Sequence, residues 1–334
     1  MRRAALLVVV ALLLALPFLA GPMLTLGTIV LAKALAVLGV FLLLQAGQVS
    51  FGHGMFFAVG AYSAAYIGAA WRGADLLVLA VAAAGLSALA GLVVGLFVAR
   101  YRSIFFGMLN LAFSMVLFAV LEKFFHLTGG TDGMRIRRPT LLGFEFGRGS
   151  FDLVLYYFVL GLSLLCALLV WQYLRSPIGQ ALKALKSNET RLEYIGLSAR
   201  NTVLAAYVLS AVLCGLGGLS LGIVQGLATP DYTFWTRSSE FVFIAVLGGT
   251  GHVVGAFAGS LVYEAVRFYA AALLDDSWQL ILGAVLIAII LGAPGGIIDL
   301  PRRFGLAGRK RKAEAAPTDA APAMRAPYRE GAAS

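Results

Sequence analysis

The side chains best able to bind a polar solute or carry a proton lie together at residues 45–54, which read QAGQVSFGHG. This segment interrupts residues 34–71, a stretch that contains no Asp, Glu, Lys or Arg. In hydrocarbon every backbone polar group needs a partner, so irregular backbone persists only where protein or water lines it. One interpretation is therefore a solute pathway, and the other is a polar connection between two helices at the water interface. The residues assigned to the pathway are Gln48, Ser50, Gly52 and His53.

Two of these residues suggest a finer role. Ser50 is placed to cap a helix that runs through residues 57–64. The N-terminus of such a helix, at membrane depth, carries the partial positive charge that transporters direct at the anionic groups of a solute. His53 could carry protons, but a hydrogen-bonded structural histidine is the interpretation that we favour.

A second glycine-rich break, GGTGH at residues 248–252, divides an apolar segment about halfway along the length of a membrane span. Two interrupted apolar segments in separate halves of a chain point to a transport path, so Gly249 and Gly251 are assigned to it. A series of acids along a proton path is missing. The charges within the apolar segments are Lys33, Glu240, Glu264 and Arg267, of which the last two are spaced to pair on one helix.

Residues 175–200 have the pattern of a helix–turn–helix rather than of a minimal connection. Ser-Pro at 176–177 reads as a helix start, a second helix over 189–195 is expected to stop at Gly196, and Ser198 is placed to cap the next span. The first helix has an apolar stripe made of Ile178, Ala181, Leu182 and Leu185. This stripe needs a partner: the lipid surface, the underside of the membrane bundle, or a docked cytosolic protein.

Motifs for catalysis and metal binding are missing or lack their context. There is no glycine-rich phosphate loop ending in Lys-Ser or Lys-Thr, and the three histidines have no zinc-protease spacing. Ser220 lies in a Gly-x-Ser-x-Gly pattern, but within one helix, where Gly218, Gly222 and Gly226 allow close packing. The two cysteines are expected to be apolar packing residues. We therefore predict no catalytic residue, no metal site and no cofactor bound by this chain.

Composition predicts the elements that must position these residues. Of the 334 residues, 60% are hydrophobic and 13% are charged, and the mean hydropathy is +0.90. Soluble domains have about 25% charged residues, so this composition disfavours a soluble enzyme or a disordered regulator. The chain contains eight long stretches without a charged residue, and a bilayer crossing needs about 20 apolar residues. We predict an all-α polytopic membrane protein with eight to ten transmembrane helices, some of them broken, and ten as the best count.

Charge placement predicts the orientation and the domains. The net charge is +10, and basic residues concentrate at the ends of apolar segments, which fits the positive-inside bias rather than a nucleic-acid surface. Both termini and residues 175–200 would then be cytoplasmic, and residues 126–150 would lie outside. Residues 1–22 are expected to be a retained span rather than a cleaved leader. Residues 1–300 would form the membrane domain, and residues 301–334 a basic, disordered cytoplasmic tail that touches anionic lipid.

Four segments, taken together, carry the motifs of one known family. They are 45–62, which begins QAGQVSFGHG; 105–133, which contains FFGMLNLAFS and LTGGTDG; 179–189, which reads GQALKALKSNE; and 240–259, which contains a Leu-Gly-Gly-x-Gly element. In these segments and in their order the chain resembles the permeases of branched-chain amino acid ABC transporters of the LivM type.

The resemblance implies a subunit of a bacterial inner-membrane importer. Such a permease pairs with a second homologous permease, two cytoplasmic ATPase subunits and a periplasmic substrate-binding protein. ATP would be bound by those ATPase subunits and not by this chain. Gly52 and His53 would belong to the translocation pathway. The ATPase coupling loop would comprise Gly179, Ala181, Leu182, Leu185, Glu189 and Gly196.

The expected function is therefore that of a non-enzymatic permease subunit for branched-chain or related hydrophobic amino acids. The same resemblance leaves permeases for urea, short amides or aromatic acids open, because selectivity in such systems rests mainly with the binding protein. Two alternatives come from other classes. One is a self-sufficient secondary transporter or channel, which the scarcity of intramembrane acids disfavours. The other is a membrane-embedded hydrolase that uses Ser220.

Overall fold

The computed structural model of the protein describes residues 23–297 except 195, 274–277 and 293–294. Within these residues the chain is helical apart from two short strands and the connections, which confirms the predicted all-α class. The long helices are α2 (Leu24–Gln45), α3 (His53–Ala70), α4 (Leu76–Val98), α5 (Ser103–Lys123), α7 (Arg148–Arg175), α10 (Ala199–Gln225), α11 (Trp235–Gly248), α12 (Val254–Leu273) and α13 (Trp278–Gly292).

Five of these helices are long and apolar enough to cross a membrane, judged by length and composition: α2, α4, α5, α7 and α10. α3 and α12 have 18 and 20 residues but carry polar or charged side chains, and α13 is shorter and strongly apolar. The chain is therefore a polytopic helical membrane protein. The count of ten spans stays a prediction, because residues 1–22 lie outside the described part of the chain, as does the tail at 301–334.

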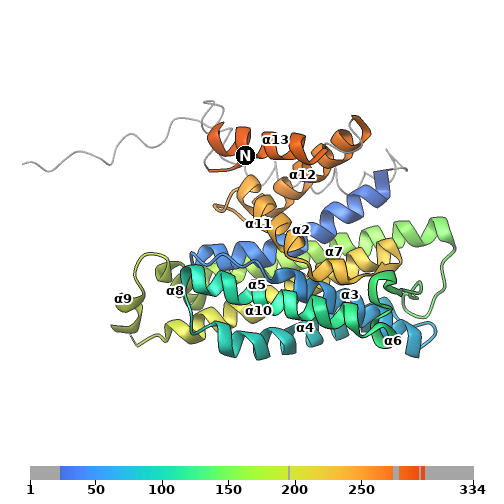
Figure 1. The fold of residues 1–334 in the computed structure, drawn as a ribbon, viewed down its shortest axis with the longest axis horizontal. Coiled ribbons are helices and arrows are strands. Elements are labelled where there is room, and N and C mark those ends of the chain that lie inside the picture. Colours follow the sequence, from blue (N-terminus) through green and yellow to red (C-terminus); the bar gives the residue numbers. More distant parts are fainter. Residues whose placement is uncertain (1–22, 195, 274–277, 293–294, 298–334) are drawn as a thin grey trace, which may run out of the picture. The chain divides into compact units, whose positions relative to one another are not determined.

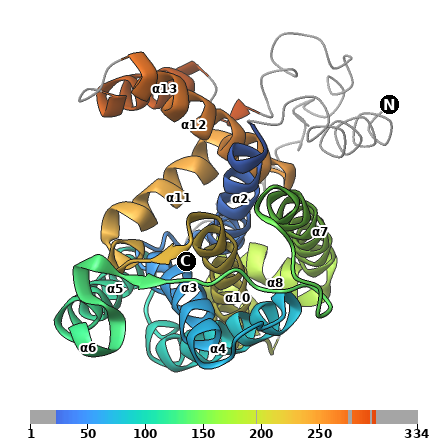
Figure 2. The same ribbon diagram turned by 90° about the vertical axis from the view of Figure 1, so that its right-hand side faces the viewer.

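α10 lies at the centre of the bundle and packs against α2, α3 and α4 (Figure 2). Glycines bring its backbone close to that of α3: a Cβ at Gly218 would collide with the carbonyl oxygen of Phe57. Lipid tails are as apolar as the helices, so the hydrophobic effect does not bring helices together in a membrane. Close approach of this kind stabilises their contact by van der Waals packing instead. The predicted glycine ladder is confirmed at Gly218 and Gly222, whereas Gly226 lies beyond the helix, with a φ of +68°.

The two ends of the bundle carry different connections (Figure 1). At one end α8 (Pro177–Leu185) and α9 (Glu189–Tyr194) form a feature that we call the elbow, residues 176–198. At the other end, which we call the sheet end, lie α6 (Phe125–Thr128), η2 (Gly130–Asp132), η3 (Pro230–Thr233) and the antiparallel pair of β1 (Met134–Arg135) and β2 (Leu227–Ala228). The segments that charge placement assigned to opposite sides of the membrane thus lie at opposite ends of the bundle.

Both predicted helix breaks are present. The uncharged stretch 34–71 divides between α2 and α3 at residues 46–52. Gly249, whose φ is +95°, ends α11, and α12 begins at Val254. A Cβ at Gly249 would also collide with the carbonyl oxygen of Gly295, so this position requires glycine for two separate reasons.

Candidate functional site

The helix starts and stops of the elbow are those that the sequence predicts. The Ser176 hydroxyl accepts a hydrogen bond from the Gly179 N–H at 3.2 Å, with Pro177 as the first helical residue. Gly196, after α9, has a φ of +82°. The Ser198 hydroxyl accepts from the Asn201 N–H at 3.3 Å and so caps α10. The chain therefore enters its central helix directly from the elbow.

The apolar stripe of α8 lies mainly against the bundle. Ala181 and Leu182 are buried, and Leu185 is half-buried and packs against a small cluster that joins α8 to α9 and α10. Gly179 is buried as well. It packs so closely that a Cβ there would collide with the carbonyl oxygen of Tyr173. Of the three partners considered for the stripe, the underside of the bundle covers most of it. Docking by the elbow stays a prediction, and these four residues lie on its inner side.

The outer side of the elbow exposes different apolar residues. Tyr194 is 86% exposed, Ile178 is 53% exposed and Leu197 is 43% exposed. Only Ile178 belongs to the stripe read from the sequence. Periodicity of apolar residues identifies the face of a helix that is buried in its own protein. Tyr194 and Leu197 are exposed, so this pattern did not point to them.

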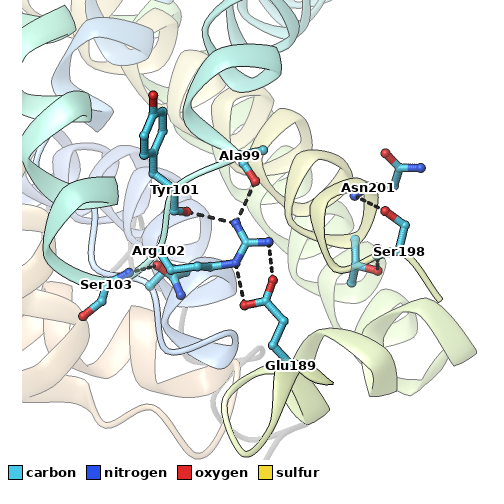
Figure 3. Close-up of polar contacts among 9 residues, drawn as sticks. Ala99, Tyr101, Arg102, Ser103, Glu189, Ser198 and Asn201 are labelled. Atoms are coloured by element: carbon cyan, nitrogen blue, oxygen red, sulfur yellow. Dashed lines mark hydrogen bonds and ion pairs between the residues drawn. The ribbon is translucent and has the colours of Figure 1, made fainter. Parts of the chain in front are cut away.

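Arg102, in the α4–α5 turn, clamps the elbow to the bundle (Figure 3). Its Nε and Nη2 donate to the two carboxylate oxygens of Glu189 at 3.1 and 2.9 Å. Its Nη1 donates to the carbonyl oxygens of Ala99 and Tyr101 at 2.7 and 2.9 Å. The sequence singled out Glu189 but not Arg102, because the two are 87 residues apart and only the fold joins them.

The first glycine-rich break adjoins this clamp. The Gln48 side-chain oxygen accepts a hydrogen bond from the Ser103 N–H at 2.8 Å, next to Arg102. Ser103 has a φ of +56°, a left-handed conformation that is rare for residues other than glycine. A Cβ at Gly47 would touch the side chain of Lys186 in the elbow. Residues 46–52 thus form a helix–helix connection at the elbow end of the bundle.

His53 lies at the centre of a closed hydrogen-bond network and is fully buried. The Ser210 hydroxyl donates to the carbonyl oxygen of Gly39 at 2.7 Å, so it accepts from His53 Nε2 at 2.6 Å. His53 Nδ1 is then the acceptor for the Ser50 hydroxyl at 2.7 Å, and the Ser50 oxygen accepts from the Gly52 N–H at 3.4 Å. Every polar atom of the imidazole has a partner, which is the geometry of a structural histidine.

The predicted cap of α3 by Ser50 is wrong. The N-cap residue is Gly52, and the Ser50 hydroxyl is engaged by His53. The Gly54 N–H, in the first turn of α3, instead donates to the Ser238 hydroxyl of α11 at 2.8 Å. A residue 184 positions away therefore occupies this amide of the helix N-terminus, and local sequence holds no signal for it.

The two glycine-rich breaks meet in space. The Gln45 side-chain nitrogen, at the end of α2, donates to the Thr250 carbonyl oxygen at 2.8 Å. Gly249 is buried, whereas Gly251 is exposed with open space around it. Gly52 is buried too, and a Cβ there would collide with the carbonyl oxygen of Asn110 in α5. Their assignment to a pathway stays a prediction; the structure places both breaks beside each other.

The intramembrane charges converge on one cluster. The buried Lys33 of α2 donates to both Glu240 of α11 and Glu264 of α12. Arg237 Nη1 lies 2.8 Å from Glu240, and Arg267 Nη1 lies 3.7 Å from Glu264, so the pair predicted on α12 is present. The sequence named four of the five members and did not name Arg237, which lies one helical turn before Glu240 on α11.

Ser220 has none of the surroundings that a nucleophile needs. It is buried within α10, and its hydroxyl donates to the Leu216 carbonyl oxygen of the same helix at 2.8 Å. Among the described residues no group of three or more His, Cys, Asp or Glu side chains could hold a metal ion. The two cysteines are buried and free, as predicted.

The described part of the chain is thus a polytopic helical bundle with interrupted helices and a structured elbow. The family model described as the branched-chain amino acid transport system permease component matches residues 22–290. The chain belongs to this family. The members described here are transport permease components and not enzymes. The chain spans slightly less than two thirds of the length of the LivM relatives that it matches.

Several curated relatives have similar sequences. The chain is 27% identical over 277 residues to the high-affinity branched-chain amino acid transport system permease protein LivM of Escherichia coli K12, and the match covers 77% of this chain and 65% of LivM. It is 28% identical over 171 residues to BraD of Pseudomonas aeruginosa, covering 49% of this chain and 55% of BraD. It is 27% identical over 127 residues to LivH of Escherichia coli K12, covering 38% of this chain and 41% of LivH. No solved structure matches the chain.

Proposed function

We propose that this chain is the membrane permease subunit of an importer for branched-chain or related hydrophobic amino acids, powered by ATPase subunits on separate chains. The observation that carries this proposal is the elbow. It presents exposed apolar side chains on its outer side, and Arg102 fixes it to the bundle through two hydrogen bonds to Glu189. Movement of an ATPase subunit bound to the elbow would therefore be transmitted directly to the bundle.

The partners follow from the same proposal. The relatives include both LivM and LivH of one organism, which supports a second, homologous permease as the neighbour of this chain. Two cytoplasmic ATPase subunits would bind the elbow and supply ATP hydrolysis, and a periplasmic binding protein would deliver the solute at the sheet end. The location would be the bacterial inner membrane, with both termini in the cytoplasm.

Contacts near the elbow give a route for transmission. Movement of α9 would act through Glu189 on Arg102 and the α4–α5 turn. The adjoining Ser103 N–H is held by Gln48, so the same movement would reach the connection at 46–52. The glycine-rich break would then open or close in step with the ATPases.

The docking surface is tested by Leu197→Ala and by Tyr194→Ala, at exposed positions where truncation leaves the core intact. Both should reduce co-purification of the ATPase subunits with the detergent-solubilised permease, since apolar and aromatic anchors dominate protein interfaces. The matched control is Leu127→Ala, an exposed leucine at the sheet end. Gly179→Arg is unsuitable, because it would also break the buried turn into α8. Unchanged recovery of the ATPases in both elbow variants would contradict docking at this surface.

The division of labour is tested in proteoliposomes. The complex with its ATPases and binding protein should accumulate leucine only when ATP is present, and vesicles with this chain alone should not. Accumulation by the chain alone, driven by an ion gradient and insensitive to ATP, would replace the proposal by the secondary-transporter alternative. ATP-dependent uptake of urea, short amides or aromatic acids, with no uptake of leucine, would keep the mechanism and change the substrate.

A further inference from the structure

A groove that has no part in the proposed function lies between α3, α4 and α5, with a volume of about 650 Å³. Its floor is formed by side chains of α3 from Met55 to Ile67. Its walls are formed by side chains between Leu86 and Val94 of α4 and between Phe113 and Val120 of α5. At 1.5 Å per residue the groove extends about 18 Å along α3, which is more than half of the hydrocarbon thickness of a bilayer, about 30 Å.

The lining of the groove is apolar. No charged side chain lines it, and hydroxyl groups belong only to Tyr62, Ser63 and Tyr66. The Ser63 hydroxyl donates to the carbonyl oxygen of Gly60 at 2.6 Å, and the Tyr66 hydroxyl donates to that of Leu127 at 2.8 Å. The Tyr62 hydroxyl is covered by protein atoms. An occupant therefore meets carbon, and a charged group would find no partner here.

The walls of the groove belong to helices that face outward. α4 and α5 are the least buried of the five helices that are long and apolar enough to cross a membrane, whereas α2 and α10 are mostly buried. Val93 of α4 and Val116 of α5 both line the groove and are 63% and 62% exposed. In a membrane protein such side chains contact hydrocarbon. The occupant of the groove therefore comes from the bilayer, either as a lipid chain or as a neighbouring membrane helix.

The dimensions favour a lipid chain over a helix. Spread along about 18 Å of α3, the volume corresponds to a channel about 7 Å across, whereas a helix with its side chains is about 10–12 Å in diameter. Near the end of α4, the ring of Phe97 packs against that of Phe113 in α5, with centroids 5.9 Å apart. These two rings occupy the space between the walls, so a helix could not continue past them.

An unfilled groove at this position would weaken the packing of both walls. α4 and α5 each pack more extensively against α3 than against each other. Atoms that line an empty space lose the van der Waals contacts that they would make on that side. An apolar chain in the groove would supply those contacts to both walls and so connect α5 to α4.

We propose that the groove binds an acyl chain of a membrane phospholipid, which lies along α3 between the walls formed by α4 and α5. This inference rests on the shape and the chemistry of the groove and does not depend on the solute that the protein transports. α5 begins at Ser103, directly after Arg102, which holds Glu189 of the elbow. The bound lipid would therefore stabilise the position of a helix that starts at this contact.

Occupancy is measured on the full chain in phosphatidylcholine nanodiscs that contain a small share of phosphatidylcholine with a diazirine in one acyl chain. After illumination, the side chains that line the groove should be labelled more heavily than Leu165, Leu168 and Leu169, which are exposed leucines of α7 outside the groove. Equal labelling of the two sets would overturn the proposal. Loss of the groove label on assembly with the partner permease would also overturn it, since a helix of the partner would then be the occupant.

Filling of the groove provides a second test. Ala90→Phe places a ring in the groove, and Ala112→Phe, at an exposed alanine of α5 outside the lining, is the matched control. In lipid-free detergent, added phosphatidylcholine should raise the thermal midpoint of the wild type and of the control, since a ligand of the folded state stabilises it. Ala90→Phe should lose most of this rise together with the groove label. Ala90→Leu replaces it if the larger ring prevents folding. An equal rise in all proteins would contradict lipid binding in the groove.

Discussion

At the scale of single residues, His53 shows how a polar side chain is held in an apolar bundle. It receives and donates one hydrogen bond each, with Ser50 and Ser210, and its ring packs at its edge against Phe56 and Tyr207. A hydrogen bond between transmembrane helices contributes only about 0.6 kcal/mol on average. Filling of space by the ring must therefore account for most of its contribution to stability.

We predict that His53→Ala destabilises the protein by about 2–4 kcal/mol, because it leaves a cavity and two hydroxyls without their partner. Ser210→Ala, which removes two hydrogen bonds and little volume, should cost about 1 kcal/mol. Thermal unfolding in detergent would report the order of the midpoints, with His126→Ala, at an exposed histidine, as the control. A larger loss in Ser210→Ala than in His53→Ala would contradict the assignment of stability to packing.

At the scale of elements, the contact between α3 and α10 depends on glycines that leave no room for a side chain. A Cβ at Gly60 would collide with the backbone of Gly215, and a Cβ at Gly215 would collide with the Ser87 hydroxyl of α4. Three helices thus approach one another at one level of the bundle. Backbone cannot move aside as a flexible side chain can, so even one methyl group must push the helices apart.

Gly60→Ala should therefore lower the thermal midpoint strongly or prevent accumulation of folded protein, and Gly215→Ala should act in the same direction. Gly85→Ala in α4 is the matched control, since a Cβ there meets nothing within 4 Å and alanine has the higher helix propensity. It should leave the midpoint unchanged or raise it slightly. Equal midpoints for Gly60→Ala and Gly85→Ala would show that α3 and α10 are not packed in this way.

The elements were largely predictable, whereas the contacts between them were not. Charge-free stretches predicted the helices, and glycine clusters predicted where they stop, because both are local consequences of the membrane and of backbone conformation. The helix starts at Ser176 and Ser198 were predicted correctly, because serine is a common N-cap residue. The cap of α3 was missed, since Ser238 comes from a distant helix, and so was Arg102, the partner of Glu189. Distance along the chain hides such pairs.

At the scale of the whole molecule, Lys33 joins the start of the described chain to its end. It lies on α2 and binds carboxylates of α11 and α12, more than 200 residues away. Among the helix pairs, α12 also packs against α2 and α11. The cluster therefore fastens the α11–α12 hairpin to the bundle around α10.

Lys33→Met should destabilise the protein by about 3–5 kcal/mol, the cost of leaving buried carboxylates without their shared cation. Replacing the carboxylates as well, by Glu240→Gln with Glu264→Gln, should not recover that loss, because Arg237 and Arg267 would then lose the carboxylates that they face. Lys123→Met, at an exposed lysine, serves as the control for the loss of a charge. If Lys33→Met were as stable as Lys123→Met in detergent, the cluster would not fasten the hairpin.

The continuity of α10 has a mechanical consequence. Its 27 residues correspond to about 40 Å of unbroken helix, which starts at the Ser198 cap of the elbow and stops one residue before β2. An α-helix is stiff along its axis, so a tilt imposed at the elbow end of α10 also displaces its other end, at the sheet end of the bundle. A force applied at the elbow can thereby displace the sheet end without any signal passing from side chain to side chain.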